Sequence, residues 1–328
     1  MRIFSCIQPT GRKHLGNYLG AIRGYVEGQD RGDAVYCIVD LHALTVGPDP
    51  AELRRSLYDT TAILLAAGLD PARCILFRQS DVREHTELCW VLATVASYGE
   101  LSRMTQFKEK SAQHKQFVSS GLFFYPVLQA ADILAYDTDE VPIGEDQKQH
   151  IELTREIAQR FNARFGETLV VPTHRIPPVG ARIQDLQSPG KRMSTTASTE
   201  QGAVYILDAP GSVQRKFRTA VTDSGTEIVR GPDKAGITNL IEILSVVRGV
   251  DPAAIEREFA GLGYGAFKAA VGDAVVEYLA PVRERYEKLR ADEAGLEATL
   301  ADGAAKAHAI ASRTLARVRA AMGIGAPG

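Results

Sequence analysis

Hydrophobic positions in the first half of the chain alternate between two patterns. Short apolar runs predict buried strands at residues 2–8, 34–40, 74–77 and 141–143. Longer segments with apolar residues three and four positions apart predict helices at 14–26, 50–67, 84–97, 126–136 and 147–162. This alternation predicts an α/β fold with a Rossmann-type parallel sheet and helices on both of its faces. Such a sheet binds ligands at the carboxyl ends of its strands.

The pattern changes at residues 184–203. Gly, Ser, Thr, Pro and Gln dominate this stretch and no period survives, which predicts an exposed, mobile loop. Helical spacing returns at 211–221, 237–247, 252–259, 267–292 and 304–322. We therefore expect a Rossmann-type domain at 1–183, the loop at 184–203, a smaller all-helical domain at 204–292 and a C-terminal helical segment at 293–328.

Composition and charge narrow the class of protein. Of the 328 residues, 45% are apolar and 24% are charged, which excludes a disordered or fibrous chain. The 38 basic and 40 acidic residues nearly cancel, so any contact with nucleic acid must be local. No apolar run reaches membrane-spanning length and the first residues lack the apolar stretch of a signal peptide, so we expect a cytoplasmic protein without membrane contact.

Cysteine and histidine predict no metal site. The four cysteines are widely spaced and form no metal-binding motif, so we expect reduced thiols in apolar strands. Four histidines have no metal-ligand spacing and are interpreted as surface or structural residues, namely His85, His114, His174 and His308.

The loop after the first predicted strand is a candidate phosphate site. It leads into a helix whose first turn holds His14, Gly16 and Asn17. Backbone N–H groups at a helix start favour an anion, and the His14 and Asn17 side chains would hydrogen-bond phosphate oxygens. Gly16 would let a flat ring approach the backbone. The tripeptide 14–16 is common by itself, so its weight comes from the strand–loop–helix setting and from a second loop downstream.

That second loop is rich in cations and hydroxyl groups at residues 189–196. It suits a lid over a triphosphate, because positive charge stabilises phosphate oxygens and mobility lets product leave. Taken alone, the same residues would also fit a solvated basic loop.

Two further segments place polar groups on predicted helices. Tyr125, Gln129 and Asp132 fall on one stripe of a helix, because each residue turns the chain by about 100°. This predicts a pocket whose carboxylate accepts a hydrogen bond from a largely apolar ligand. The alternative is that these groups satisfy loop backbone N–H groups. Gly144 and Asp146 follow a predicted strand at a helix start, an arrangement typical of ribose binding.

Together these segments resemble bacterial tryptophanyl-tRNA synthetases, a family of class I aminoacyl-tRNA synthetases. The likeness extends over nearly the whole chain and includes residues 39–43, 107–110, 220–224 and 263–265. Residues 144–155 are especially characteristic, because the tyrosine-specific sister family usually carries a different sequence there. The resemblance identifies residues 14–17 with the HIGH signature of the class and residues 192–196 with its KMSKS signature.

The resemblance implies a role for individual residues. It implies ATP binding by Gln8, Thr10, His14, Gly16, Asn17, Gly144, Asp146, Arg192, Met193 and Ser194. It implies catalytic roles for Lys110, Lys191, Arg192 and Ser194. It implies tryptophan binding by Tyr125, Gln129, Asp132 and Gln147, with Asp132 on the indole N–H.

The resemblance also implies a reaction and its partners. ATP activates tryptophan to tryptophanyl-adenylate with release of pyrophosphate, Mg²⁺ accompanies the ATP, and tryptophan is then transferred to the 3′-terminal adenosine of tRNA(Trp). It implies a homodimer, an anticodon-binding role for residues 204–292 and a chain end, 293–328, that packs back on the catalytic domain. The alternatives are a tyrosine-specific ligase, a generic nucleotidyltransferase and a regulatory paralogue that binds tryptophan without aminoacylation.

Two positions depart from the family pattern. The signature loop usually offers two lysines, where this chain has Arg192 and Thr195, so one cation is missing. We expect Lys191, Lys110 or Arg192 to compensate in part; the alternative is benign subfamily variation. Gln129 replaces a common methionine, and its amide would contact indole or the α-amino group, or disfavour analogues that need an apolar wall. These departures fit a duplicate or inhibitor-resistant synthetase as well as a housekeeping one.

Overall fold

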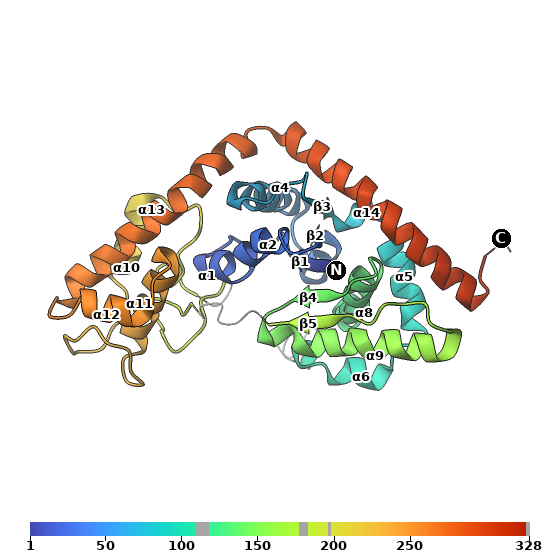
Figure 1. Cartoon of the computed structure of the whole chain (residues 1–328), viewed down its shortest axis with the longest axis horizontal. Coiled ribbons are helices and arrows are strands. Elements are labelled where there is room, and N and C mark those ends of the chain that lie inside the picture. Colours follow the sequence, from blue (N-terminus) through green and yellow to red (C-terminus); the bar gives the residue numbers. More distant parts are fainter. Residues whose placement is uncertain (109–117, 177–182, 196–197, 326–328) are drawn as a thin grey trace.

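Five parallel strands form the sheet of the computed structural model, which describes residues 1–108, 118–176, 183–195 and 198–325. The strand order is β3-β2-β1-β4-β5, so β1 lies between β2 and β4 (Figure 1). The sheet confirms the predicted Rossmann-type fold. Because the strand order reverses between β1 and β4, the carboxyl ends of these two strands form the crevice in which such sheets bind ligands. The strands span Arg2–Ile7 (β1), Asp33–Ile38 (β2), Cys74–Arg78 (β3), Glu140–Pro142 (β4) and Thr173–Arg175 (β5).

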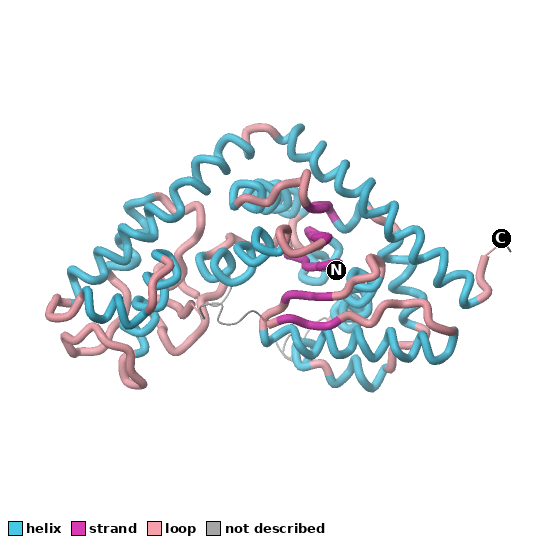
Figure 2. The backbone as a smooth tube through the Cα atoms, in the orientation of Figure 1, coloured by secondary structure: helices cyan, strands magenta, loops and turns pink. Residues whose placement is uncertain are grey.

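Helices cover both faces of the sheet, as the alternating pattern predicts (Figure 2). The side chains of β2 show this directly: Ala34 and Tyr36 belong to one hydrophobic core, and Val35 and Cys37 belong to the other. The helices of this part are α1 (Leu15–Asn17), α2 (Arg23–Gly28), α3 (Asp40–Ala43), α4 (Pro50–Ala67), α5 (Glu84–Ala93), α6 (Tyr98–Arg103), α8 (Ser120–Leu134) and α9 (Lys148–Phe165). A π-helical turn spans Tyr18–Ile22, and 3₁₀ turns span Leu44–Val46, Gln79–Asp81 and Glu145–Gln147.

A helical domain lies beside the sheet and is joined to it by two long helices (Figure 1). It contains α10 (Pro210–Arg218), α11 (Ala235–Arg248), α12 (Pro252–Glu258) and the first part of α13 (Tyr264–Arg290). The far end of α13 reaches α4, where Arg290 Nε donates to Asp59 Oδ1 at 2.6 Å. Helix α14 (Glu293–Met322) then packs across β3. A Cβ at Gly303 would overlap the carbonyl oxygen of Leu76, so glycine is what allows this close approach.

Several sequence predictions were wrong in detail. Helix α8 begins at Ser120 rather than 126, because Ser119 caps it and Pro126 removes only the N–H that would bond one turn back. Strand β5 was not predicted, since all three of its residues are polar. Cys89 lies on α5 and not in a strand, although all four cysteines are free thiols. No helix in the described part of the chain is long and apolar enough to cross a membrane.

Candidate active site

A buried lysine holds the loop between β1 and α1. Lys13 is 7% exposed, and its Nζ donates to the carbonyl oxygens of Gln8 at 2.7 Å and Thr10 at 3.1 Å. Burial lowers the pKa of Lys13 to about 8. The Thr10 hydroxyl turns toward the Gln8 side chain, 3.5 Å from Oε1. The backbone of Gln8 and Thr10 is therefore fixed at the carboxyl end of β1.

His14 is the N-cap of α1 and is paired with Asn17. Its Nδ1 accepts a hydrogen bond from the Asn17 N–H at 3.2 Å, and Asn17 Oδ1 accepts one from the His14 N–H at 3.0 Å. Burial, with the charges of Arg192 and Lys13, lowers the pKa of His14 to about 4. The ring is therefore neutral near pH 7. Because Nδ1 accepts, the proton is on Nε2, which can donate to a phosphate oxygen.

This pairing bears on two expectations for the helix start. The N–H groups of His14 and Asn17 have side-chain partners, and the Leu15 N–H donates to the Val204 carbonyl at 2.7 Å. These three backbone groups therefore already have partners within the chain, and anion binding at this helix start stays a prediction. At Gly16 a Cβ would lie 3.1 Å from the His14 ring, so the small size of glycine also makes room for the imidazole; the approach of a flat ring stays a prediction.

The turn after β4 meets the 184–203 loop. A Cβ at Gly144 would lie 2.7 Å from Asp146 Oδ1, so glycine lets this carboxylate fold over the turn. Asp146 Oδ2 accepts from Gln147 Nε2 at 2.9 Å, and Oδ1 lies 3.5 Å from the Arg192 guanidinium. The Arg192 side chain is 66% exposed. The structure thus brings together a predicted ribose-binding residue and a predicted phosphate-binding residue that lie 46 positions apart.

The 184–203 loop is anchored beside this turn. Met193 is buried, and its N–H donates to the Ile183 carbonyl at 3.0 Å. The Ser194 N–H donates to Ser198 Oγ at 2.9 Å, while Lys191 is exposed. The buried methionine holds the loop, and the neighbouring cations face outward.

Thr195 lies against the β1–α1 loop. Its Oγ1 donates to the Arg12 carbonyl at 3.4 Å, and its methyl group would overlap a Cβ at Gly11, where φ is +63°. The position that lacks the second signature cation is therefore next to the predicted phosphate site. Lys110 and Thr196 lie outside the described residues.

Asp132 is fully buried on α8 and is an ionised carboxylate. Oδ1 accepts from Gln79 Nε2 at 2.7 Å and from His85 Nδ1 at 2.5 Å, and Oδ2 accepts from His42 Nε2 at 2.8 Å. Burial alone would raise the pKa of Asp132, but the hydrogen bonds from His42 and His85 hold it well below its usual range. Since a carboxylate oxygen can accept two hydrogen bonds, Oδ2 keeps one acceptor position for a ligand. All three partners are side chains, so the alternative role of satisfying loop backbone N–H groups is wrong for Asp132.

A second layer of contacts orients these donors. With Nδ1 donating to Asp132, His85 Nε2 accepts from the Tyr136 hydroxyl at 2.6 Å. Gln79 Oε1 accepts from the Leu41 N–H at 3.1 Å, which fixes the direction of its amide. The side chains that donate to Asp132 are thus themselves fixed by hydrogen bonds, and they hold its carboxylate in one orientation.

Tyr125 extends the same helix face, as the spacing predicts. Its ring lies 6.2 Å from that of His42, and its hydroxyl lies 3.2 Å from Gln106 Oε1 and 2.9 Å from His150 Nε2. Gln129 is half-buried between Tyr125 and Asp132 along this helix.

Four polar residues of this region were not predicted to belong to the site: His42, Gln79, His85 and His150. His85 is 0% exposed and structural, as interpreted, but it contacts the predicted ligand-binding carboxylate. For two of them, the position in the sequence after a predicted strand was a signal. His42 and Gln79 follow the carboxyl ends of β2 and β3, where a parallel sheet places its ligand-binding groups.

Comparisons with known proteins extend over both domains. Residues 1–280 match the family described as tRNA synthetases class I (W and Y). The tryptophan–tRNA ligase of Wolinella succinogenes is 47% identical over 323 residues, 98% of each chain. The tryptophan–tRNA ligase 2 of Streptomyces avermitilis is 50% identical over 319 residues, 96% of this chain and 95% of that one. The crystal structure of tryptophanyl-tRNA synthetase from Campylobacter jejuni complexed with ADP and tryptophan has a TM-score of 0.85 at 32% identity, covering 99% of this chain and 100% of that one.

Proposed function

The chain belongs to the class I tRNA synthetases for tryptophan and tyrosine, and on that premise we propose that it is a tryptophan–tRNA ligase. The observation that carries this function is the 47% identity to a tryptophan–tRNA ligase over 98% of both chains. The substrates are ATP, L-tryptophan and tRNA(Trp). The geometry supports this assignment, because His14, Asp146 and Arg192 gather at the crevice between β1 and β4.

The reaction has two steps. An oxygen of the tryptophan carboxylate attacks the α-phosphorus of ATP; the new O–P bond replaces the bond to the bridging oxygen, and pyrophosphate leaves. The terminal ribose hydroxyl of the tRNA then attacks the tryptophanyl carbonyl, and AMP leaves. Neither step forms a bond to the protein, so positioning and stabilisation of phosphate charge supply the rate.

The proposed ATP site uses the strand ends. His14 donates from Nε2 to a phosphate oxygen, and Asp146 accepts from ribose hydroxyls. Arg192, Lys191 and Ser194 stabilise the charge on the departing pyrophosphate. The remaining assignments, to Gln8, Thr10, Gly16, Asn17, Gly144, Met193 and Lys110, rest on the resemblance to the family and stay predictions.

The proposed tryptophan site lies on the face of α8. The second acceptor position of Asp132 Oδ2 binds the indole N–H, in competition with water. Tyr125 and Gln147 hold the ammonium end, and Gln129 lies between these groups and the ring. The preset orientation of Asp132 supports this assignment, since a carboxylate that cannot rotate discriminates ligands by where their N–H points.

Mg²⁺ accompanies ATP in this proposal. In the part of the chain that the structure describes, no three His, Cys, Asp or Glu side chains are placed to hold a metal ion. The donor set therefore does not fit an ion held by the protein alone. Phosphate oxygens and water suit Mg²⁺ well, so the ion belongs to the nucleotide substrate.

The domain roles, oligomeric state and compartment are part of the same proposal. Residues 1–183 form the catalytic domain, residues 204–292 bind the anticodon, and residues 293–328 return to the catalytic domain. A homodimer is supported by Trp90 on α5 and Tyr98 on α6, which are 72% and 77% exposed. The cytoplasm is supported by the four free thiols, which persist in a reducing compartment.

Amino-acid-dependent ATP–pyrophosphate exchange tests the function. We expect purified protein to exchange with tryptophan and not with tyrosine or other amino acids. Exchange with tyrosine would overturn the specificity. Tryptophan binding without any exchange would favour the regulatory paralogue, whose supporting observation is the missing cation at Thr195.

A further inference from the structure

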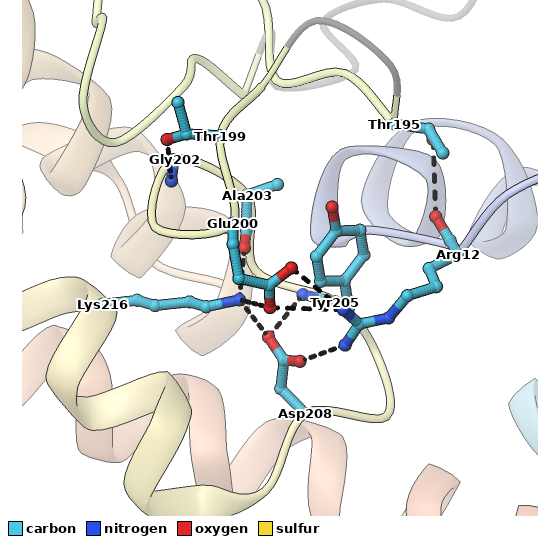
Figure 3. A network of polar contacts seen from close by, with 9 residues as sticks. All are labelled: Arg12, Thr195, Thr199, Glu200, Gly202, Ala203, Tyr205, Asp208 and Lys216. Atoms are coloured by element: carbon cyan, nitrogen blue, oxygen red, sulfur yellow. Dashed lines mark hydrogen bonds and ion pairs between the residues drawn. The ribbon is translucent and has the colours of Figure 1, made fainter.

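Two cations and two carboxylates meet where the β1–α1 loop touches the chain after the 184–203 loop (Figure 3). Arg12, Glu200, Asp208 and Lys216 gather around the ring of Tyr205, and we call these five residues the Arg12 cluster. The two positive and two negative charges balance. The function proposed above assigns no role to any of the five.

Asp208 and Lys216 form the buried half of the Arg12 cluster. They are 5% and 1% exposed, and Lys216 Nζ lies 2.8 Å from Asp208 Oδ2. The same ammonium donates to the Ala203 carbonyl at 2.8 Å, and Asp208 Oδ2 also accepts from the Tyr205 N–H at 2.9 Å. Breaking this buried and hydrogen-bonded ion pair would leave an uncompensated charge, so the Asp208 side chain is held in place.

Arg12 bonds to two carboxylates, one with each of its terminal nitrogens. One donates to Asp208 Oδ1 at 2.6 Å, and the other lies 3.1 Å from Glu200 Oε2. The guanidinium carbon lies 3.8 Å from the centroid of the Tyr205 ring. Because both nitrogens have carboxylate partners, this guanidinium is directed away from phosphate binding even though it lies on the loop that carries Gln8 and His14.

The backbone that follows Arg12 is hydrogen-bonded to the segment around Tyr205. His14 and Tyr205 form an antiparallel bridge, and the Ile206 N–H donates to the Lys13 carbonyl at 2.9 Å. The Arg12 side chain and the backbone after it therefore bind one short stretch of chain. That stretch begins where the 184–203 loop ends.

We propose that Arg12 is a positioning residue for adenylate formation. By binding Asp208 and Glu200, it fixes the loop that carries Gln8 and His14 against the chain that leaves the 184–203 loop. The inference rests on the proposed function, because it takes this loop to hold ATP. Its effect is specific to ATP, since the elements around Asp132 contain no member of the Arg12 cluster.

The test compares Arg12→Ala and Arg12→Lys with the unmodified enzyme in tryptophan-dependent ATP–pyrophosphate exchange. We expect Arg12→Ala to raise KM for ATP about tenfold, with KM for tryptophan within about twofold of the unmodified value. Arg12→Lys should recover only part of the loss, because lysine keeps the charge without the planar fork. Arg23→Ala is the matched control: Arg23 is another exposed arginine, paired with Glu27 at 3.3 Å, and both KM values should stay unchanged.

Glu200→Gln tests the contact with the 184–203 loop. The Glu200 side chain is 59% exposed, so the fold should tolerate the change. If Arg12 acts partly through Glu200, the double variant should raise KM for ATP less than the product of the two single effects. A double effect equal to that product would remove Glu200 from the proposal.

An unchanged KM for ATP in Arg12→Ala would overturn the role of Arg12. An equal rise in both KM values would also overturn it, because a general loosening of the fold predicts that result. Calorimetric titration with ATP alone separates this inference from the proposed function. Weakened ATP binding in Arg12→Ala, in a protein that shows no exchange, would refute the ligase and keep Arg12 as a residue that positions an ATP-binding loop. Exchange with unchanged ATP binding would refute the role of Arg12 alone.

Discussion

Asp132 Oδ1 lies 2.5 Å from His85 Nδ1 in a site where both side chains are fully buried. The contact means that the carboxylate is oriented before any ligand arrives. It also means that the same group bears on stability and, in the proposed tryptophan site, on ligand selection.

Asp132→Asn is expected to lower the free energy of unfolding by about 2–4 kcal/mol, because an amide nitrogen must then face one of the three donors. Urea unfolding at pH 7 measures this loss. Asp30→Asn, a change at an exposed carboxylate paired with Arg73, is the control and should cost less than about 1 kcal/mol. Equal losses in the two variants would contradict the buried network.

His14 predicts a pH dependence of stability. Its pKa is about 4 in the folded chain against 6.5 for the free side chain. The unfolded chain therefore binds a proton first, so stability is fully present above pH 6.5 and is lost as the pH falls toward 4. His14→Asn keeps a good N-cap and removes the titration. Urea unfolding of both proteins from pH 7 to pH 4 should show the unmodified chain losing up to about 3 kcal/mol more than the variant; parallel curves would contradict this.

Thr195→Lys restores a second cation beside the proposed phosphate site. If charge there limits adenylation, the exchange rate should rise about three- to tenfold. Thr195→Met has similar length without charge and should give no rise. An unchanged rate in Thr195→Lys would show that other cations, such as Lys191 and Arg192, already supply the charge.

Gly303→Ala is expected to destabilise the protein by about 1–3 kcal/mol, because the new methyl group overlaps the Leu76 carbonyl between α14 and β3. Gly24→Ala, in α2, has nothing within 4 Å of the added Cβ and should be neutral or stabilising by up to about 1 kcal/mol. Denaturant unfolding of the pair measures the difference. A neutral Gly303→Ala would mean that α14 does not pack this closely on the sheet.

Trp90→Glu tests the proposed dimer. Light scattering should give twice the chain mass of 35.6 kDa for the unmodified protein and a lower mass for the variant, since a charge would replace a buried ring at the interface. Val229→Glu changes an apolar side chain that is 39% exposed on the helical domain and should leave the mass unchanged. A monomeric unmodified protein would refute the dimer.

The sequence predicted which residues of the candidate site come directly after the strands. His14 and Asp146 come shortly after β1 and β4, so a parallel sheet brings them to one edge whatever the details of packing. The pairing of His14 with Asn17 was not predictable in the same way, because each side chain could equally well hydrogen-bond a phosphate oxygen. The network around Asp132 depends on side chains from three separate elements, which periodicity does not bring together.

Boundaries were predicted best where a capping residue marks them. Asp49 caps α4 and Pro50 begins it, and the predicted range 50–67 is the observed one. In α8 the proline at 126 lies inside the helix, and the true start depends on a single hydroxyl of Ser119. Strand β5 carries no apolar pattern, so only its pairing with β4 defines it.

Helix α13 connects the helical domain to the helices beside the sheet. Its 27 residues span about 40 Å, from the helical domain to the side of α4. At its far end both Tyr286 and Arg290 donate hydrogen bonds to Asp59. Pro281 interrupts the backbone hydrogen bonds of the helix shortly before these two residues, so the helix bends most easily there. A tilt of the helical domain would therefore bend α13 near Pro281, while the end of the helix stays bonded to Asp59 on α4.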